Sequence, residues 1–206
     1  LLDAYGSFGA LGDVAPGKQG VITGDNVRFV RNPWEVHRST EWTSNDGARI
    51  ASWQPYIQGA AGTIWIEPLR SIIQWSASGL QIQNHEKNGK LASRPQNLDL
   101  CFTRGVAFAA IGQDFSARIH RFESIFSDVG ASLFPDSVDS VCALMNSTRA
   151  RFILCSLNPT VHFTIGDVNR LPLLPVEQGE TMFGELSTPF AIHESHSEPS
   201  VEFQQP

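Results

Sequence analysis

The feature that most constrains this sequence is a single sustained helical pattern. Apolar residues between Ser137 and Leu157 recur at the spacing of one helical face. Ser137 or Asp136 can cap the start of this helix, and Pro159 ends it. Elsewhere the apolar runs are short, rich in β-branched and aromatic residues, and separated by glycine or proline. We therefore predict a β-rich α+β fold of twisted antiparallel strands with one main helix, over about residues 137–157.

Short strands and loops are expected before and after this helix. Residues 21–22 and 28–30 resemble two strands around a Gly-Asp-Asn turn, and residues 64–66 and 71–75 have strand composition. Residues 76–95 are mostly polar, and residues 84–89 within them predict a mobile loop or a polar helix-loop. The segment His162–Val168 predicts a strand that enters a turn.

Composition limits the class of protein. Of 206 residues, 41% are apolar and 17% are charged, which indicates a globular chain with material for a core. No apolar run approaches the roughly 18 residues of a membrane span, and the first residues do not resemble a signal peptide. The start lacks methionine, so we expect a piece of a longer protein. Three cysteines without a CxxC pair favour a reducing, cytoplasmic location.

Charge is distributed unevenly. The net charge is −6, yet every lysine and arginine lies at or before Arg170, and basic and acidic residues balance up to Pro175. The six acids beyond that point carry the whole excess. We predict a domain over residues 1–175, followed by an acidic linker or the start of a further segment over residues 176–206. A neutral domain can still present a basic face to a specific nucleic-acid target.

Catalytic motifs with a clear physical basis are not found in the sequence. It contains neither a nucleotide-binding glycine motif nor an HExxH motif nor a GxSxG elbow. The pair Asn158-Pro159 resembles the start of an amino-methyltransferase site, which holds the target amino group and stacks an aromatic ring on the flipped base. Here Thr160 and Val161 follow, so the second proline and the aromatic ring are missing. The pair is typical of a helix end.

Four blocks of sequence resemble, in the same order, the target-recognition region of large adenine-specific DNA methyltransferases. These enzymes are the BREX-type phage-defence methyltransferases (PglX-like) and the related type IIG restriction-modification enzymes. The blocks are GVITGDNVRFVRNPWEV, WQPYIQGA with WIEPLRSIIQW, TRGVAFAAIGQDFSARI with SIFSDVGASLFP, and LNPTVHFTIGDVNRLPLLP. Gln58 and Ala60 depart from the Lys and Gly that are usual there, and IWIEPL replaces the usual Trp-Tyr-Gly.

The resemblance implies a binding role within a divided enzyme. The parent protein would be a site-specific adenine DNA methyltransferase. An upstream domain would bind S-adenosylmethionine and flip and methylate the adenine, since this chain carries no cofactor or catalytic motif. The present segment would read double-stranded DNA and position it. Whether this segment takes part in catalysis is left open.

Candidate DNA contacts are polar side chains beside turns or on strand faces. Arginines suit phosphates and guanine edges, and amides suit adenine edges. Arg118 has two expected partners, a phosphate or an internal carboxylate. The predicted contacts are Thr23, Asn26, Arg28, Arg31, Gln54, Tyr56, Gln58, Arg104, Ser116, Arg118, Thr164, Asn169 and Arg170.

Two other functions are consistent with the sequence. The neutral body and acidic tail favour a protein-interaction module that docks other defence-system subunits without touching DNA. The tail could also cover the DNA face as a mimic or an autoinhibitor. A small stand-alone enzyme is a third reading, against which the missing motifs count.

Overall fold

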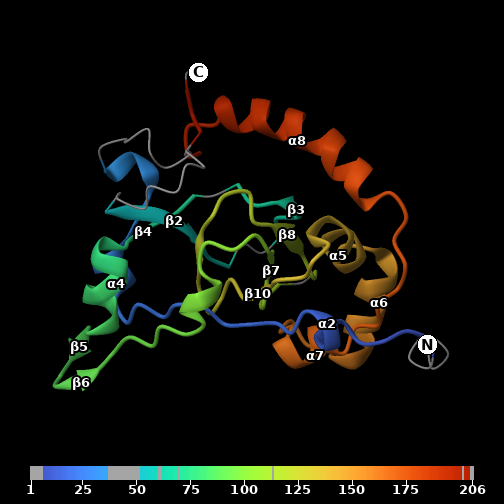
Figure 1. The fold of residues 1–206 in the computed structure, drawn as a ribbon, viewed down its shortest axis with the longest axis horizontal. Helices are drawn as coiled ribbons and strands as arrows, with labels where there is room; N and C mark the ends of the chain where they lie inside the picture. Colours follow the sequence, from blue (N-terminus) through green and yellow to red (C-terminus); the bar gives the residue numbers. More distant parts are fainter. Residues whose placement is uncertain are drawn as a thin grey trace.

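The computed structural model describes residues 7–36, 52–59, 62–68, 70–112, 114–200 and 202–204. Two small sheets lie side by side, helices gather beside the second sheet, and a hairpin projects at the opposite end (Figure 1). The α+β class predicted from the sequence is confirmed. The described helices are α2 (Leu11–Val14), α3 (Asn26–Phe29), α4 (Ser76–Gln83), α5 (Val138–Met145), α6 (Thr148–Leu157), α7 (Ile165–Asn169) and α8 (Gly179–Ser195), with short 3₁₀ turns at Pro33–Glu35 and Leu98–Leu100.

Both sheets combine antiparallel and parallel pairs. The first has the order β1-β4-β2-β9 and the second β10-β7-β8-β3, while β5 and β6 form a separate hairpin. The pairs β2–β9 and β3–β8 are parallel, which the expectation of antiparallel strands did not include. The strands are β1 (Val30–Arg31), β2 (Trp53–Ile57), β3 (Trp65–Ile66), β4 (Ile72–Gln74), β5 (Glu86–Lys87), β6 (Lys90–Leu91), β7 (Val106–Phe108), β8 (Ala117–Ile119), β9 (Ile125–Phe126) and β10 (Ser132–Leu133).

The predicted main helix is broken into α5 and α6 by Asn146. Its side-chain Nδ2 donates to the Ala117 carbonyl at 2.7 Å, and its Oδ1 accepts from the Ala117 N–H at 3.0 Å. The amide thus pairs with β8 as a strand backbone would. Ser147 then caps α6 by accepting from the Ala150 N–H. The prediction of one continuous helix was wrong. The helix ends where the Asn146 side chain forms hydrogen bonds with the backbone of β8.

Two other local expectations were also wrong. The Gly-Asp-Asn turn leads into α3, because Asp25 caps the helix through the Arg28 N–H at 3.1 Å, and the expected second strand begins only at Val30 as β1. The segment expected to be the last strand forms α7. Thr164 caps α7 and Asp167 completes the capping box, so Thr-Ile-Gly-Asp was a helix-start signal.

The acidic tail contains the helix α8. Helix α8 contacts α5 and β3, and Phe183 is buried with its ring edge-on to Trp65 at 6.0 Å between centroids. Further along, Arg121 pairs with Glu202 at 2.8 Å. The placement of a domain boundary near residue 175 stays a prediction.

Two apolar clusters stabilise the fold. One lies between the second sheet and the helices and includes Phe108, Leu133 and Leu154. The other packs around the first sheet and includes Phe29 and Ile73. Ala107 on β7 belongs to this second cluster, so β7 contributes apolar side chains to both.

A close backbone approach at Gly20 gives a test of this arrangement. A Cβ added there would lie 1.9 Å from the Phe126 carbonyl oxygen, whereas one added at Gly184 in α8 meets nothing within 4 Å. We expect Gly20→Ala to lower the free energy of unfolding by more than about 2 kcal/mol. Gly184→Ala should raise it by about 0.5–1 kcal/mol through helix propensity. Urea unfolding measures both, and an unaffected Gly20→Ala variant would contradict the packing.

Candidate nucleic-acid interface

A pocket of about 370 Å³ gathers four of the residues that the sequence predicted to contact DNA. They come from two parts of the chain: Thr23 and Asn26 from the loop before α3 and its first residue, and Tyr56 and Gln58 from strand β2 and the residue after it. Sequence reasoning did not identify Ser127 and Asp128, two polar lining residues that directly follow β9. The full lining is Val21, Ile22, Thr23, Gly24, Asp25, Asn26, Tyr56, Gln58, Ser127, Asp128 and Val129.

The loop at the pocket rim is held by its own side chains. The Thr23 hydroxyl donates to Asn26 Oδ1 at 2.5 Å and accepts from the Asp25 N–H at 3.1 Å. Thr23 itself is buried, whereas Asn26 is exposed. Among the described residues, Asn26 Nδ2 has no hydrogen-bond partner. The loop therefore fixes the position of Asn26 and leaves its amide donors open to solvent.

Tyr56 and Gln58 form the inner side of the pocket. Tyr56 is 3% exposed and its hydroxyl donates to the Val21 carbonyl at 2.9 Å. Burial, reinforced by the charge of Asp128, raises the pKa of the Tyr56 phenol, so it remains a neutral donor. Gln58 donates to the Ser71 hydroxyl at 3.0 Å. The Tyr56 side chain is thus held in place within the pocket lining, and Gln58 is a half-buried polar group beside it.

Two predicted arginines lie next to this rim in different states. Arg28 on α3 is exposed, and its guanidinium carbon lies 4.9 Å from the centroid of the Phe29 ring. It has no ion pair with any residue of the described ranges. Arg31 on β1 is half-buried, and its Nη1 donates to the carbonyls of Val27 and Val30. Arg31 therefore completes the end of α3, and Arg28 presents its charge to solvent.

Arg118 lies inside the protein. It is 0% exposed, its Nε forms an ion pair with Glu67, and its Nη2 donates to the Gln58 carbonyl. Of the two expected partners, the structure shows the internal carboxylate. In this conformation Arg118 offers no surface to a phosphate. Its hydrogen bond to the Gln58 carbonyl instead fixes the backbone of this pocket residue from inside the protein.

The remaining candidates lie elsewhere. Ser116 is 1% exposed, so it is covered by protein. Arg104 is exposed and pairs with Asp139 at 3.0 Å. Gln54 is half-buried on β2 and takes part in interactions within the fold.

Three candidates lie in or directly beside α7, which is near α2 and away from the projecting hairpin (Figure 1). Asn169 Oδ1 accepts from the Gly17 N–H at 2.8 Å and ties the N-terminal segment to α7. Thr164 caps the helix. Arg170 is exposed and pairs with Asp167 at 2.7 Å. The structure does not bring these residues together with the pocket.

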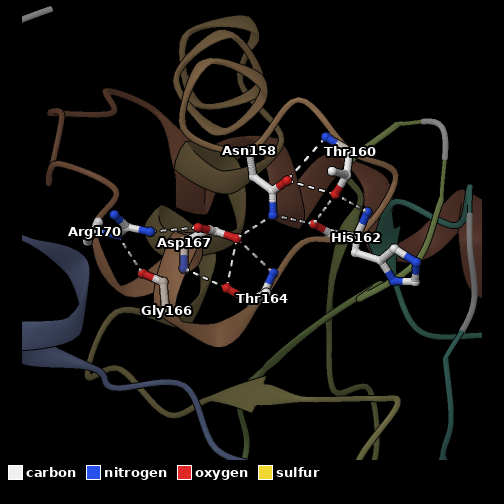
Figure 2. Close-up of polar contacts among 7 residues, drawn as sticks. All are labelled: Asn158, Thr160, His162, Thr164, Gly166, Asp167 and Arg170. Carbon is white, nitrogen blue, oxygen red and sulfur yellow. Dashed lines mark hydrogen bonds and ion pairs between the residues drawn. The ribbon is translucent and has the colours of Figure 1, made fainter.

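The Asn158-Pro159 pair is a structural corner. Asn158 Nδ2 donates to the His162 carbonyl at 2.8 Å and to Asp167 Oδ2 at 2.9 Å. Its Oδ1 accepts from the N–H and the hydroxyl of Thr160 (Figure 2). Both ends of the amide are therefore engaged within the fold, as expected of a helix end and not of a site that holds a substrate amino group.

Asp167 is the acceptor at the centre of this corner. Burial acts to raise the pKa of Asp167. Hydrogen bonds from Asn158 and Thr164, with the charge of Arg170, outweigh that effect and lower the pKa below its ordinary value (Figure 2). The carboxylate is thus held in its charged form, and it joins the end of α6 to the start of α7.

Two general features complete the picture. Among the residues that the structure describes, no cluster of three or more His, Cys, Asp or Glu side chains is arranged to hold a metal ion. Nor does any helix in the same ranges combine the length and apolar character needed to cross a bilayer.

The Arg118–Glu67 pair predicts a large cost of removing one partner. Arg118→Met leaves Glu67 buried without its cation, which should lower the free energy of unfolding by about 3–5 kcal/mol. The matched control is Arg104→Met, which breaks the exposed pair with Asp139 and should cost about 0–1 kcal/mol. Equal urea midpoints for the two variants would contradict a structural role for Arg118.

The Asn158 corner predicts a pH-dependent contribution to stability. The folded-state pKa of Asp167 lies below the unfolded value of about 3.9, so its contribution is complete above that value. It is lost as the pH falls through the folded pKa. The difference in urea midpoint between the wild type and Asp167→Asn should therefore be largest near pH 7 and shrink toward pH 3. A difference that stays constant with pH would contradict this assignment.

Asn158→Ala tests the same corner without changing charge. It removes both donors to His162 and Asp167, so we expect about 1–3 kcal/mol of destabilisation. Because Thr160 is exposed and bonds only at the rim of the corner, Thr160→Ala is the milder control. Urea unfolding at pH 7 measures both. An Asn158→Ala variant no less stable than Thr160→Ala would contradict the corner's structural role.

The sequence of this chain is similar to segments of two known proteins. The chain is 30% identical over 178 residues to the adenine-specific methyltransferase PglX of Lacticaseibacillus casei (strain Zhang). It is 24% identical over 134 residues to the adenine-specific methyltransferase BrxX of Escherichia coli O9:H4 (strain HS). These matches cover 82% and 62% of this chain. No family model matches the sequence.

The relatives are much longer than this chain. The matched segment spans 15% of the PglX protein and 11% of the BrxX protein. The modest identity over most of the chain supports the resemblance stated from the sequence. This chain is therefore related in sequence to a segment of BREX-type adenine-specific methyltransferases.

Proposed function

We propose that this chain reads a short sequence in double-stranded DNA for an adenine-specific methyltransferase of a defence system. The observation that carries the proposal is the sequence relation to a small segment of two such methyltransferases, in a chain without the Asn-Pro-Pro-aromatic motif. Catalysis and S-adenosylmethionine binding would then belong to an upstream domain, and this segment would position the duplex.

The pocket rim supplies suitable chemistry for recognition. Asn26 presents open amide donors, and an amide can bond to an adenine edge. Arg28 presents an exposed cation without an ion pair in the described ranges, suited to a phosphate or a guanine edge. Gln58 adds a second amide inside the pocket. Of the sequence-predicted candidates, we retain these three as the direct contacts.

Other candidates support the surface from within. Arg118 holds the Gln58 carbonyl, Tyr56 holds the Val21 carbonyl, and Arg31 completes α3. Such a site, with polar groups on loops fixed by a rigid scaffold, keeps its geometry before DNA arrives. We propose positioning roles for these three residues in place of direct contacts.

Selection from a random duplex pool at low salt tests this function. The chain should retain duplexes that share a short motif, and its affinity should fall with salt at a log-log slope of roughly −0.9 for each phosphate contacted. Arg28→Ala should weaken binding by about 1–3 kcal/mol. Arg149→Ala is the control, because this exposed α6 arginine has no ion pair within the described part of the chain.

The outcome separates recognition from the alternative of a protein-interaction module. No enriched motif, or equal binding by the Arg28→Ala and Arg149→Ala variants, would contradict the proposed function. Docking through an apolar surface would be insensitive to salt. Because Phe183 anchors α8 in the core, the acidic tail is better tested by Glu180→Gln with Glu185→Gln than by deletion. Stronger DNA binding by that variant would show that the tail competes for the DNA face.

A further inference from the structure

A polar segment that the sequence predicted to be a mobile loop or helix-loop forms a projecting β-hairpin. Strands β5 and β6 pair antiparallel, with Glu86 opposite Leu91 and Lys87 opposite Lys90. Asn88 and Gly89 both have positive φ, 55° and 69°, as a type I′ turn requires. The Asn-Gly pair between two short runs was the signal that could have identified this hairpin.

The hairpin tip stands clear of the protein. All residues from Glu86 to Leu91 are exposed, and a Cβ added at Gly89 would meet nothing within 4 Å. In Figure 1 the hairpin extends beyond α4 at the edge of the molecule. Few contacts with the rest of the fold therefore depend on the side chains of this hairpin, so the stability of the fold does not explain their identity.

One face of this ribbon is cationic. Lys87 and Lys90 lie directly opposite each other, and neither has an ion pair with any residue that the structure describes. Like charges in a directly opposed pair destabilise an isolated hairpin. Glu86 and Leu91 occupy the other face, since successive side chains alternate along a strand. The arrangement is explained if an anion outside the protein neutralises the two lysines.

The hairpin base adjoins the pocket rim. The Arg94 N–H donates to the Ile22 carbonyl at 2.9 Å, and the Ile22 N–H donates back at 3.2 Å. A Cβ added at Gly24 would lie 2.7 Å from the Ala92 carbonyl carbon. The ring of His85 meets Phe29 of α3 edge-on, at 5.2 Å between centroids. The ribbon is thus fixed to the loop and helix that carry Asn26 and Arg28.

We propose that the β5–β6 hairpin enters the major groove of double-stranded DNA beside the pocket. A two-stranded ribbon fits that groove, which is about 12 Å wide. Lys87 and Lys90 would contact phosphates at its edges, and Asn88 at the tip would reach a base edge. The inference rests on the proposed function and names an element that does the reading. Neither lysine was among the candidates chosen from the sequence.

Salt-dependent DNA binding by the full chain tests the lysines. Each of Lys87→Gln and Lys90→Gln should lower the magnitude of the log-log salt slope by about 1, and the double variant by about 2. Arg149→Gln is the control for loss of a distant cation. Glu86→Gln with Leu91→Thr is the control for the other face of the same ribbon. Both controls should keep the wild-type slope.

The tip residue tests base reading separately. Glycine tolerates positive φ, so Asn88→Gly keeps the turn while it removes the amide. We expect one position of the enriched motif to lose its preference, with a roughly 5- to 150-fold weaker affinity for the selected site. Methyl green, a major-groove ligand, should displace the wild-type chain from DNA more effectively than the minor-groove ligand netropsin. Far-UV circular dichroism verifies that each variant is folded.

The results distinguish the two proposals. If the wild type selects a motif but the lysine variants keep its slope and Asn88→Gly keeps its motif, the hairpin inference is wrong and the recognition function stands. Displacement by netropsin instead of methyl green would likewise overturn it. If the wild type binds no DNA at all, the recognition function fails and the hairpin inference fails with it.

Discussion

The buried guanidinium of Arg118 joins the two sheets of this protein. It lies on β8, pairs with Glu67 just after β3, and donates to the carbonyl of Gln58 just after β2. Glu67 and Arg118 belong to the second sheet, and Gln58 continues a strand of the first. A buried cation without such partners would cost several kcal/mol, so the relative position of the sheets depends on this contact. Because Arg118 also fixes the backbone of Gln58, the position of this pocket residue depends on the same contact.

Asparagine side chains fix several corners of the fold. Asn146 pairs with the backbone of β8 where α5 ends, and Asn158 connects the end of α6 to α7 through Asp167. Asn169 joins α7 to the segment around Gly17. An amide carries both a donor and an acceptor, so it can replace a backbone partner at a point where regular structure stops. Asn158, which resembles a catalytic group in the sequence, thus connects two helices.

The proposed recognition surface has a different character from the core. Asn26 and Arg28 lie on the single turn of α3, the β5–β6 hairpin is a projecting ribbon, and the polar groups of both face solvent. Beside this surface, Tyr56 and Arg118 on the sheets hold the carbonyls of Val21 and Gln58 in the pocket lining. This division allows the contacting residues to vary without disturbing the core. It suits a segment whose proposed task is to choose among DNA sequences.

The sequence by itself determined the α+β class, the strands β3 and β4, and the relation to adenine-specific methyltransferases. Strand composition is a local property, and motif order can be compared without coordinates. It also identified Asn158-Pro159 as a helix end, because the missing second proline and aromatic ring are visible in the sequence.

Only the tertiary structure decided which polar groups face solvent. Arg118 and Arg28 look alike as arginines between apolar residues, yet one pairs with a distant glutamate and the other is exposed. Three other features likewise depend on partners far away in the chain. These are the helix break at Asn146, the parallel pairing of β2 with β9, and the packing of α8 against α5 and β3. Such contacts are set by packing between segments, which a local pattern of residues does not encode.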